Sequence, residues 1–210
     1  MTLKLTGSSS GSVSLQAPAN AVSDRVLILP EDIGSAGQVL RNSATAGTLE
    51  FGSGNILQVV TATKTNQSST SSTSATTTGL SLNITPVAQT SLIILTADVG
   101  CSGCTNSDFA VFFYIGLGSS PSIITGSFGD ASGNHTRCTA FSRNDDNARG
   151  QSTNFKFVHD HDSIGQLTYS LMYSMESGGG AAFLNRVGSA ADLVNRPRTI
   201  SVLQAMEVST

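Results

Sequence analysis

Apolar residues alternate with polar ones along much of this chain, with the period of a β-strand. Leu80, Leu82 and Ile84 alternate with small polar residues in one such segment. The same alternation recurs in residues 167–175 and 200–208. Hydrophobic residues at every second position give a strand one apolar face and one polar face. No segment has the 3.6-residue period of a convincing amphipathic helix, so the pattern predicts an all-β protein.

Two other segments, residues 92–95 and 109–115, are apolar on both faces. A strand of this kind belongs in the middle of a sheet, where the facing sheet of a sandwich covers one side. We expect a neighbouring subunit to cover the other side. In residues 109–115 the second face carries Phe112 and Tyr114. These two aromatic residues are therefore the predicted subunit interface.

Residues 1–54 consist of short strand-like segments separated by turn residues. Fixing a backbone costs about 1–2 kcal/mol per residue, and the few aliphatic side chains of this region cannot offset that by packing on one another. We therefore predict an extended arm that gains its shape by lying against other molecules. Its predicted contact residues are the apolar positions of the strand-like segments: Val13, Leu15, Val26, Ile28, Leu49 and Phe51.

These segments resemble the amino-terminal region of structural proteins from tailed phages, particularly marine and cyanobacterial ones. The similar stretches are GSVSLQAPA, LILP, GSAGQVL and GTLEF, and then ILQVVTATKT, TGLSLNITP and SLIILTADV. In that loose family of fibre and head-decoration proteins, such segments precede a β-sandwich, and the sandwiches are commonly homotrimers. The resemblance therefore implies a virion structural protein that forms a homotrimer.

The predicted organisation is an arm, residues 1–54, followed by a jelly-roll-like two-sheet β-sandwich, residues 55–210. About eight strand-like segments separated by Gly, Asn and Ser turns suit such a sandwich. Residues 61–78 contain 13 Ser or Thr and are predicted to form strand plus turn, with a disordered linker as the alternative. Strands apolar on both faces, together with an arm that lacks its own core, require association with other subunits.

Charge and the length of the longest apolar run argue against two classes of partner. The net charge is −3, and no basic cluster stands out in the sequence, whereas phosphate binding needs several Lys or Arg on one face. We therefore expect no nucleic-acid partner. The apolar run at residues 109–117 is too short to cross a bilayer, and no signal-peptide core follows Met1. We expect no membrane partner, assembly in the host cytoplasm, and a final location in the virion.

Three cysteines and a histidine form the strongest candidate for a metal site. Cys101 and Cys104 have paired spacing, as do His135 and Cys138, and this set of ligands suits tetrahedral zinc. The alternative, which we favour, is free or disulfide-bonded cysteines in surface loops. We therefore expect no cofactor, with structural zinc as the exception to test.

His159 and His161 would share one face of a strand with Phe155 and Phe157. Near a threefold axis these histidines would bind a metal or respond to pH. A solvated loop or sheet edge is the favoured alternative. Residues 144–147 offer oxygen ligands but lack the spacing of a calcium loop, so an exposed polar turn is expected there.

No catalytic motif has the context it requires. Residues 7–11 match G-x-S-x-G, but they lie in a Ser/Gly run without the buried strand and helix of a nucleophile elbow. We therefore expect no enzyme, and no paired carboxylates support a depolymerase. The predicted function is a capsid decoration (cement) or head-fibre protein that binds the shell, including the major capsid protein, through its arm. The alternative is a short tail fibre that recognises host-surface glycan, which the lack of Trp disfavours.

Overall fold

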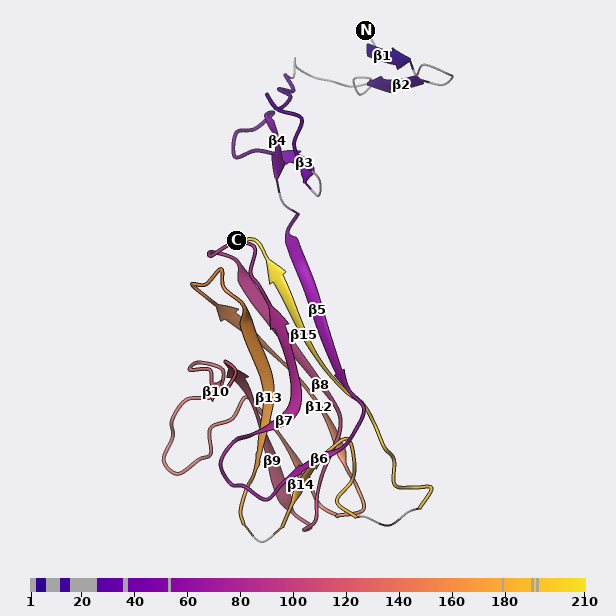
Figure 1. Ribbon diagram of the computed structural model, residues 1–210, viewed down its shortest axis with the longest axis vertical. Helices are drawn as coiled ribbons and strands as arrows, with labels where there is room; N and C mark the ends of the chain where they lie inside the picture. Colours follow the sequence, from indigo (N-terminus) through magenta and orange to yellow (C-terminus); the bar gives the residue numbers. More distant parts are fainter. Residues whose placement is uncertain are drawn as a thin grey trace. The chain divides into compact units, whose positions relative to one another are not determined.

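The computed structural model describes residues 3–6, 12–15, 26–35, 38–52, 54–178, 180–189, 191 and 193–210. The chain forms two compact units, Met1–Gly54 and Asn55–Thr210, which we call the leading unit and the sandwich. The described residues form fifteen strands and no helix (Figure 1). They accordingly include no helix with the length and apolar character needed to span a membrane. The prediction of an all-β protein is confirmed.

The leading unit contains two small antiparallel hairpins. They are β1 (Leu3–Thr6) with β2 (Ser12–Leu15), and β3 (Val39–Asn42) with β4 (Leu49–Gly52). The apolar run at residues 26–29, predicted to be a strand, forms only a single bridge, in which Ile28 pairs with Thr48. An ion pair between Arg41 and Glu50, 3.0 Å from Nε to Oε1, joins β3 to β4. This unit therefore has few pairing partners for its backbone.

The first sheet of the sandwich has six strands, and every pair of neighbours is antiparallel. The central strand β8 has β15 on one side, and β15 in turn pairs with β5. On its other side, β8 pairs first with β12 and then, near its end, with β14, which carries β6. The strands are β5 (Ile56–Lys64), β6 (Ser68–Thr70), β8 (Leu92–Cys104), β12 (Gln151–Asp160), β14 (Ala182–Leu184) and β15 (Ser201–Val208).

The second sheet has five strands, and its neighbours are also antiparallel. β13 lies between β7 and β9, and the far edge of β9 pairs with both β10 and β11. The strands are β7 (Thr76–Ile84), β9 (Phe109–Leu117), β10 (Ser122–Ile123), β11 (Ala140–Asn144) and β13 (Leu167–Met175).

The strand order is that of a jelly roll. The eight strands of five or more residues in the sandwich are, in chain order, β5, β7, β8, β9, β11, β12, β13 and β15. The first, eighth, third and sixth of them lie side by side in one sheet, and the second, seventh, fourth and fifth lie side by side in the other. This order places two Greek keys in one sandwich. The predicted jelly-roll-like fold is confirmed.

The hydrophobic core lies between the two sheets and follows the alternation in the sequence. Leu80, Leu82 and Ile84 of β7 are buried, whereas the residues between them are exposed. Tyr169 and Leu171 of β13 are buried in the same core. Burying one Leu, Ile or Phe side chain contributes about 1.5–3 kcal/mol, so this two-sided closure provides most of the stability of the sandwich.

The two ends of the sandwich differ in what they carry. At one end β5 begins, directly after the leading unit, and the chain finishes, with Ser209 N–H donating to the carbonyl oxygen of Asn55. At the opposite end lie the loops between β5 and β6, β8 and β9, β11 and β12, and β14 and β15 (Figure 1). Hydrogen bonds tie these loops together, for example from Ser189 N–H to the carbonyl oxygen of Asn147. We call this the loop end.

Candidate assembly and binding surfaces

The leading unit exposes an unusual number of large aliphatic side chains. Val26 is 74% exposed and Ile33 is 95% exposed. Both values are high for residues whose transfer out of water is favourable. We call the whole group the exposed aliphatic set: Val26, Leu27, Ile28, Leu29, Ile33, Val39 and Leu40.

Three of the predicted contact residues meet at one hollow of the leading unit. Ile28, Leu49 and Phe51 line a pocket of about 330 Å³ together with residues 29–32. The chain closes tightly beside it, because a Cβ on Gly34 would lie 2.6 Å from the Phe51 ring. Of the other predicted contacts, Val26 is exposed. The backbones of Val13 and Leu15 lie in β2, and their side chains are outside the described part of the chain.

The predicted interface on β9 has one accessible residue. Tyr114 lies on the predicted outer face but is only 6% exposed, because its own chain covers it. Burial raises the pKa of the Tyr114 hydroxyl; a hydrogen bond with Ser174 lowers it in part, and the Cys138 thiol raises it further. Phe112 is half-buried and pairs across the sheet with the exposed Phe141 of β11. Phe112 and Phe141 therefore remain available for a subunit contact, whereas Tyr114 does not.

The structure does not bring the four predicted zinc ligands together. Cys101 and Cys104 are in strand β8, not in loops as expected. Cys104 belongs to the core between the sheets. Cys101 is buried against Gly150, because a Cβ built on Gly150 would lie 2.2 Å from the sulfur of Cys101. Cys138 is near Tyr114 instead. Among the residues that the structure describes, no three His, Cys, Asp or Glu side chains form a metal-binding group.

Burial also sets the protonation state of these cysteines. It raises the pKa of Cys101 and Cys138. Burial raises the pKa of Cys104 to about 11, although the neighbouring Asn144 side chain acts in the opposite direction. All three thiols are free in this structure. These thiols are therefore protonated at neutral pH.

His159 and His161 lie on one side of the chain at the end of β12, with ring centroids 6.3 Å apart. His159 Nδ1 is 2.6 Å from the hydroxyl oxygen of Tyr169. Ser163 N–H donates to Nδ1 of His161, so Nε2 of that ring carries the proton and donates to the Ser91 hydroxyl. Among the described strands, β12 pairs only with β8, so His159 lies on a sheet edge as predicted. Both imidazoles are nevertheless held by hydrogen bonds inside the chain.

The same end of the sandwich contains a buried carboxylate. Glu207 of β15 accepts hydrogen bonds from the Ser91 hydroxyl, the Gln58 amide and the backbone N–H groups of Val87 and Ala88. Burial raises the pKa of Glu207, but these four hydrogen bonds outweigh that effect and the net shift is downward. Glu207 is therefore ionised at neutral pH and joins β5, β15 and the β7–β8 loop.

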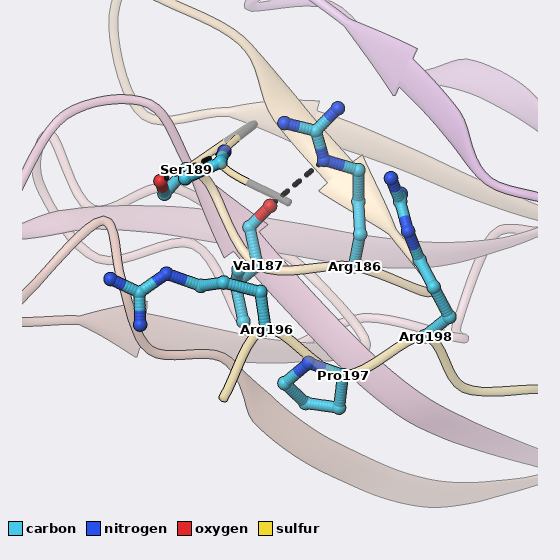
Figure 2. Close-up of a pocket in the computed structure, with 7 residues that line it drawn as sticks. Arg186, Val187, Ser189, Arg196, Pro197 and Arg198 are labelled. Carbon is cyan, nitrogen blue, oxygen red and sulfur yellow. Dashed lines mark hydrogen bonds between the residues drawn. The ribbon is translucent and has the colours of Figure 1, made fainter. Parts of the chain in front are cut away.

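Three arginines line a second pocket, which no pattern in the sequence predicted. It lies in the loop between β14 and β15 and has a volume of about 330 Å³ (Figure 2). We call it the arginine pocket. Its lining residues are Arg186, Val187, Ser189, Ala191, Arg196, Pro197 and Arg198.

Asn185 turns the chain from β14 into this loop. Its φ of 63° is in the left-handed region, which asparagine tolerates better than most residues. Its buried side chain donates to the carbonyl oxygen of Lys64 and accepts from the Ser201 hydroxyl. Arg186 follows directly and forms an antiparallel bridge with Arg198. The turn at Asn185 therefore brings together two arginines that are well separated in the sequence.

The guanidinium groups of Arg186 and Arg198 lie close together. Figure 2 shows their side chains running side by side, while Arg196 extends on the side of Ser189. Arg186 and Arg198 both donate to Oε1 of Gln67. Burial lowers the pKa of Arg186, and the charge of Arg198 lowers it further. The sequence places only Arg196 and Arg198 close together, and the fold adds Arg186 to them.

Comparison with protein-family models and with curated proteins finds no match to this chain. Among solved structures, the chain is similar to structures of infectious bursal disease virus. The Gt strain structure has 16% identity and a TM-score of 0.38, over 98% of this chain and 46% of that chain. The VP2 subviral particle of the same virus has 14% identity and a TM-score of 0.34, over 82% of this chain and 43% of that chain.

This chain spans less than half the length of the solved chains that it matches. The TM-scores are below 0.5 and the identities below 25%. Similarity at this level does not define a function, so the functional argument rests on the surfaces of this chain.

Proposed function

We propose that this protein is a structural component of a virus particle, in which the leading unit binds other subunits of the particle. The observation that carries the proposal is the exposed aliphatic set, seven large apolar side chains in a unit with two small hairpins. Four of these side chains, at residues 26–29, are consecutive, and exposed apolar clusters commonly mark interaction sites. Burial of each side chain on a partner would contribute up to about 1.5–3 kcal/mol.

The resemblance of residues 11–51 and 56–99 to tailed-phage structural proteins supports a more specific form of the proposal. In this form the protein is a capsid decoration (cement) or head-fibre protein and its partner is the major capsid protein. A protein that binds only the assembled shell stabilises it by its binding free energy, and many copies multiply the effect. We expect a homotrimer located in the virion, with no enzymatic activity and no cofactor.

A second candidate is a short tail fibre that binds a receptor. The loop end favours it, because four loops meet there at the end of the sandwich opposite to the start of β5 (Figure 1). Surface loops held by a rigid sandwich are a common location for ligand binding. This candidate shares the anchoring role of the leading unit, so both forms predict the same effect of mutations in the exposed aliphatic set.

Charged substitutions in the exposed aliphatic set test the proposal. Val26→Asp or Ile28→Asp is expected to abolish attachment to particles, because each places a charge where apolar surface must be buried. Val158→Asp is the matched control, since Val158 is similarly exposed but lies on β12 of the sandwich. Thermal unfolding of the sandwich should be the same in all three variants. Unchanged occupancy of Val26→Asp and Ile28→Asp on purified particles would refute the proposal.

The proposed homotrimer is tested on β9 and β11. Phe112→Glu and Phe141→Glu place charges on the accessible part of the outer face of the five-stranded sheet. Light scattering should show a smaller species for each variant than for the natural protein. An unaltered mass would remove this face from the subunit interface.

A further inference from the structure

Among the described residues, the arginine pocket concentrates positive charge without an acidic side chain in an ion pair with it. Acidic residues outnumber basic ones in this chain, 14 to 11. Yet the ion pairs within the described residues involve Arg41, Arg143 and Arg149, and none involves an arginine of the pocket. Asp192, in the same loop, lies outside the described residues. Like charges held close together raise the free energy of the folded protein, and a bound anion relieves this repulsion.

The pocket is also pre-organised. Arg186 donates from Nε to the carbonyl oxygen of Val187 and from its two Nη atoms to Gln67 and Gly188. Its guanidinium carbon lies 4.0 Å from the centroid of the Phe183 ring. Gly188 holds the loop against β8, because a Cβ there would lie 1.6 Å from the carbonyl oxygen of Cys104. The plane of the Arg186 guanidinium is therefore fixed before any ligand arrives, which lowers the entropy cost of binding.

Several N–H donors of the pocket remain available. A guanidinium has five N–H groups, and Arg186 uses three of them. Arg198 donates to Gln67, and Arg196 donates to the carbonyl oxygen of Ala148. The buried Nε of Arg196 has no hydrogen-bond partner. A buried donor without a partner costs free energy, and an acceptor atom in the pocket would remove that cost.

The chemistry of the lining favours an acidic sugar. Guanidinium groups bind planar oxyanions such as carboxylate through paired hydrogen bonds. The Ser189 hydroxyl adds a partner for a hydroxyl group of the sugar. The volume of about 330 Å³ is at the lower limit of small-molecule pockets, which suits a ligand of one or two rings. Nucleic acid fits less well, because phosphate backbones are bound by extended rows of basic residues.

We propose that the arginine pocket binds the carboxylate of an acidic saccharide, with Arg186 and Arg198 holding the oxyanion and Arg196 and Ser189 contacting the rest of the sugar. The site lies at the loop end of the sandwich, and all of its lining residues belong to that unit. The exposed aliphatic set belongs to the leading unit, so the two proposals rest on different residues and are tested separately. A failure of sugar binding leaves the assembly proposal intact, and the reverse also holds.

Titration of the full-length protein with glucuronate and with N-acetylneuraminate, followed by NMR and calorimetry, tests the site. We expect at least one of them to bind with a dissociation constant of about 1 mM or below, and glucose to bind at least about tenfold more weakly. Affinity should fall when salt is added, because the contact is ionic. No binding of either acid at about 10 mM overturns the proposal. That is the result expected if a carboxylate of the chain, such as Asp192, already satisfies the arginines.

Competing ligands separate a sugar site from a general anion site. Sulfate and phosphate should bind at least about tenfold more weakly than the preferred acidic sugar, because they cannot use Ser189 and Arg196 together. Equal affinity for sulfate overturns the saccharide assignment and leaves an inorganic anion site. Binding of an oligonucleotide or an acidic peptide that glucuronate and N-acetylneuraminate do not displace also overturns it.

Arginine variants assign the contact to this pocket. Arg198→Gln and Arg186→Gln should each weaken binding of the acidic sugar by about tenfold or more. Arg137→Gln is the matched control, because Arg137 also donates to a backbone carbonyl and stacks on a phenylalanine, Phe128, but lies outside the pocket. Equal weakening in Arg137→Gln, or unchanged binding in Arg198→Gln, overturns the assignment. Arg198 is the safer variant for folding, because its side chain is exposed.

Discussion

The leading unit and the sandwich use the same aliphatic residue types with opposite outcomes. In the sandwich, Ile93 and Leu203 are fully buried between two sheets. In the leading unit, Ile33 and Leu29 are largely exposed. Alternation or clustering of apolar residues creates an apolar face in both regions. The difference shows that a second layer is needed to cover such a face, and the described part of the leading unit does not provide one.

The two regions also differ in how many neighbours each strand pairs with. Strands β8, β9, β13 and β15 have partners on both edges. Each described strand of the leading unit pairs with one other strand only. Isolated two-stranded hairpins are marginally stable in water, whereas several paired strands with a hydrophobic face are stable. The sandwich is therefore expected to fold by itself, and the leading unit is expected to need a partner.

The largest expected effect comes from the core of the sandwich. Leu171→Ala should lower the free energy of unfolding by about 2–5 kcal/mol, because it removes a fully buried side chain and leaves a cavity. The matched change Leu29→Ala in the leading unit should alter it by less than about 0.5 kcal/mol. Urea unfolding of both variants measures the difference. Similar losses in the two variants would contradict the contrast between the units.

A smaller effect is expected at the buried carboxylate. Glu207→Gln should lower the free energy of unfolding by about 1–3 kcal/mol, because the neutral amide accepts the four hydrogen bonds less well. Glu31→Gln, at an exposed position of the leading unit, is the control and should have almost no effect. Thermal unfolding in the same buffer compares them. A stability of Glu207→Gln equal to that of the natural protein would show that the network is not stabilising.

Acid should destabilise the sandwich in two steps. Burial lowers the pKa of His159, and the neighbouring His161 lowers it further, while Asp160 acts in the opposite direction. The unfolded chain therefore takes up this proton first, and stability falls as pH drops below about 6.5. Glu207 also has a lowered pKa, so its contribution is lost at more acidic pH, below its ordinary value of 4.5. Urea unfolding between pH 7 and 3 follows both steps.

His159→Gln isolates the first step. Glutamine retains a hydrogen-bonding group for the Tyr169 hydroxyl but does not titrate. The variant should lose less stability than the natural protein between about pH 7 and 5. The same slope in both proteins would assign the first step to another group.

The smallest expected effect on the sandwich comes from removing the leading unit. Residues 55–210 alone should melt within about 2 °C of the full chain, because the core between the sheets is contained in them. In the full chain without partners, amides of residues 26–52 should exchange much faster than those of β8 and β13. Equal protection of both regions in a monomeric protein would contradict the need for a partner.

Much of the fold followed from the sequence, because alternation is a local property. Residues 167–175 and 200–208 were predicted as one-sided strands, and β13 and β15 cover these segments. The predicted faces were wrong, because both faces of β13 are buried over most of its length, and β15 buries Leu203 and Ala205 in place of Val202 and Met206. Of the exposed turn predicted at residues 144–147, residues 145–147 lie in the loop that joins β11 to β12, whereas Asn144 is a buried residue of β11. The prediction failed at Cys101 and Cys104, which belong to β8. Glycines interrupt the alternation of apolar and polar residues in that part of the strand. Gly103 leaves room for the loop after β14, because a Cβ on Gly103 would lie 2.5 Å from the backbone nitrogen of Gly188.

The candidate sites were less predictable than the strands. Val26 and Ile28 are exposed, and their role as assembly contacts stays a prediction. Tyr114 is not part of the core between the sheets, as predicted, but it is buried within its own chain and its hydroxyl is hydrogen-bonded to Ser174. The arginine pocket depends on a bridge between Arg186 and Arg198, which no local pattern specifies. These outcomes required knowledge of which distant segments meet.

The sequence by itself determined the class of fold and the division between a region with regular alternation and a region without it. Strand period and turn residues act over a few neighbouring positions, so they can be read directly from the order of amino acids. Only the tertiary structure decided which apolar faces are covered, which side of β8 each cysteine takes, and how the three arginines meet. Those outcomes depend on pairing between strands far apart in the chain, and a period of two residues does not specify the partner.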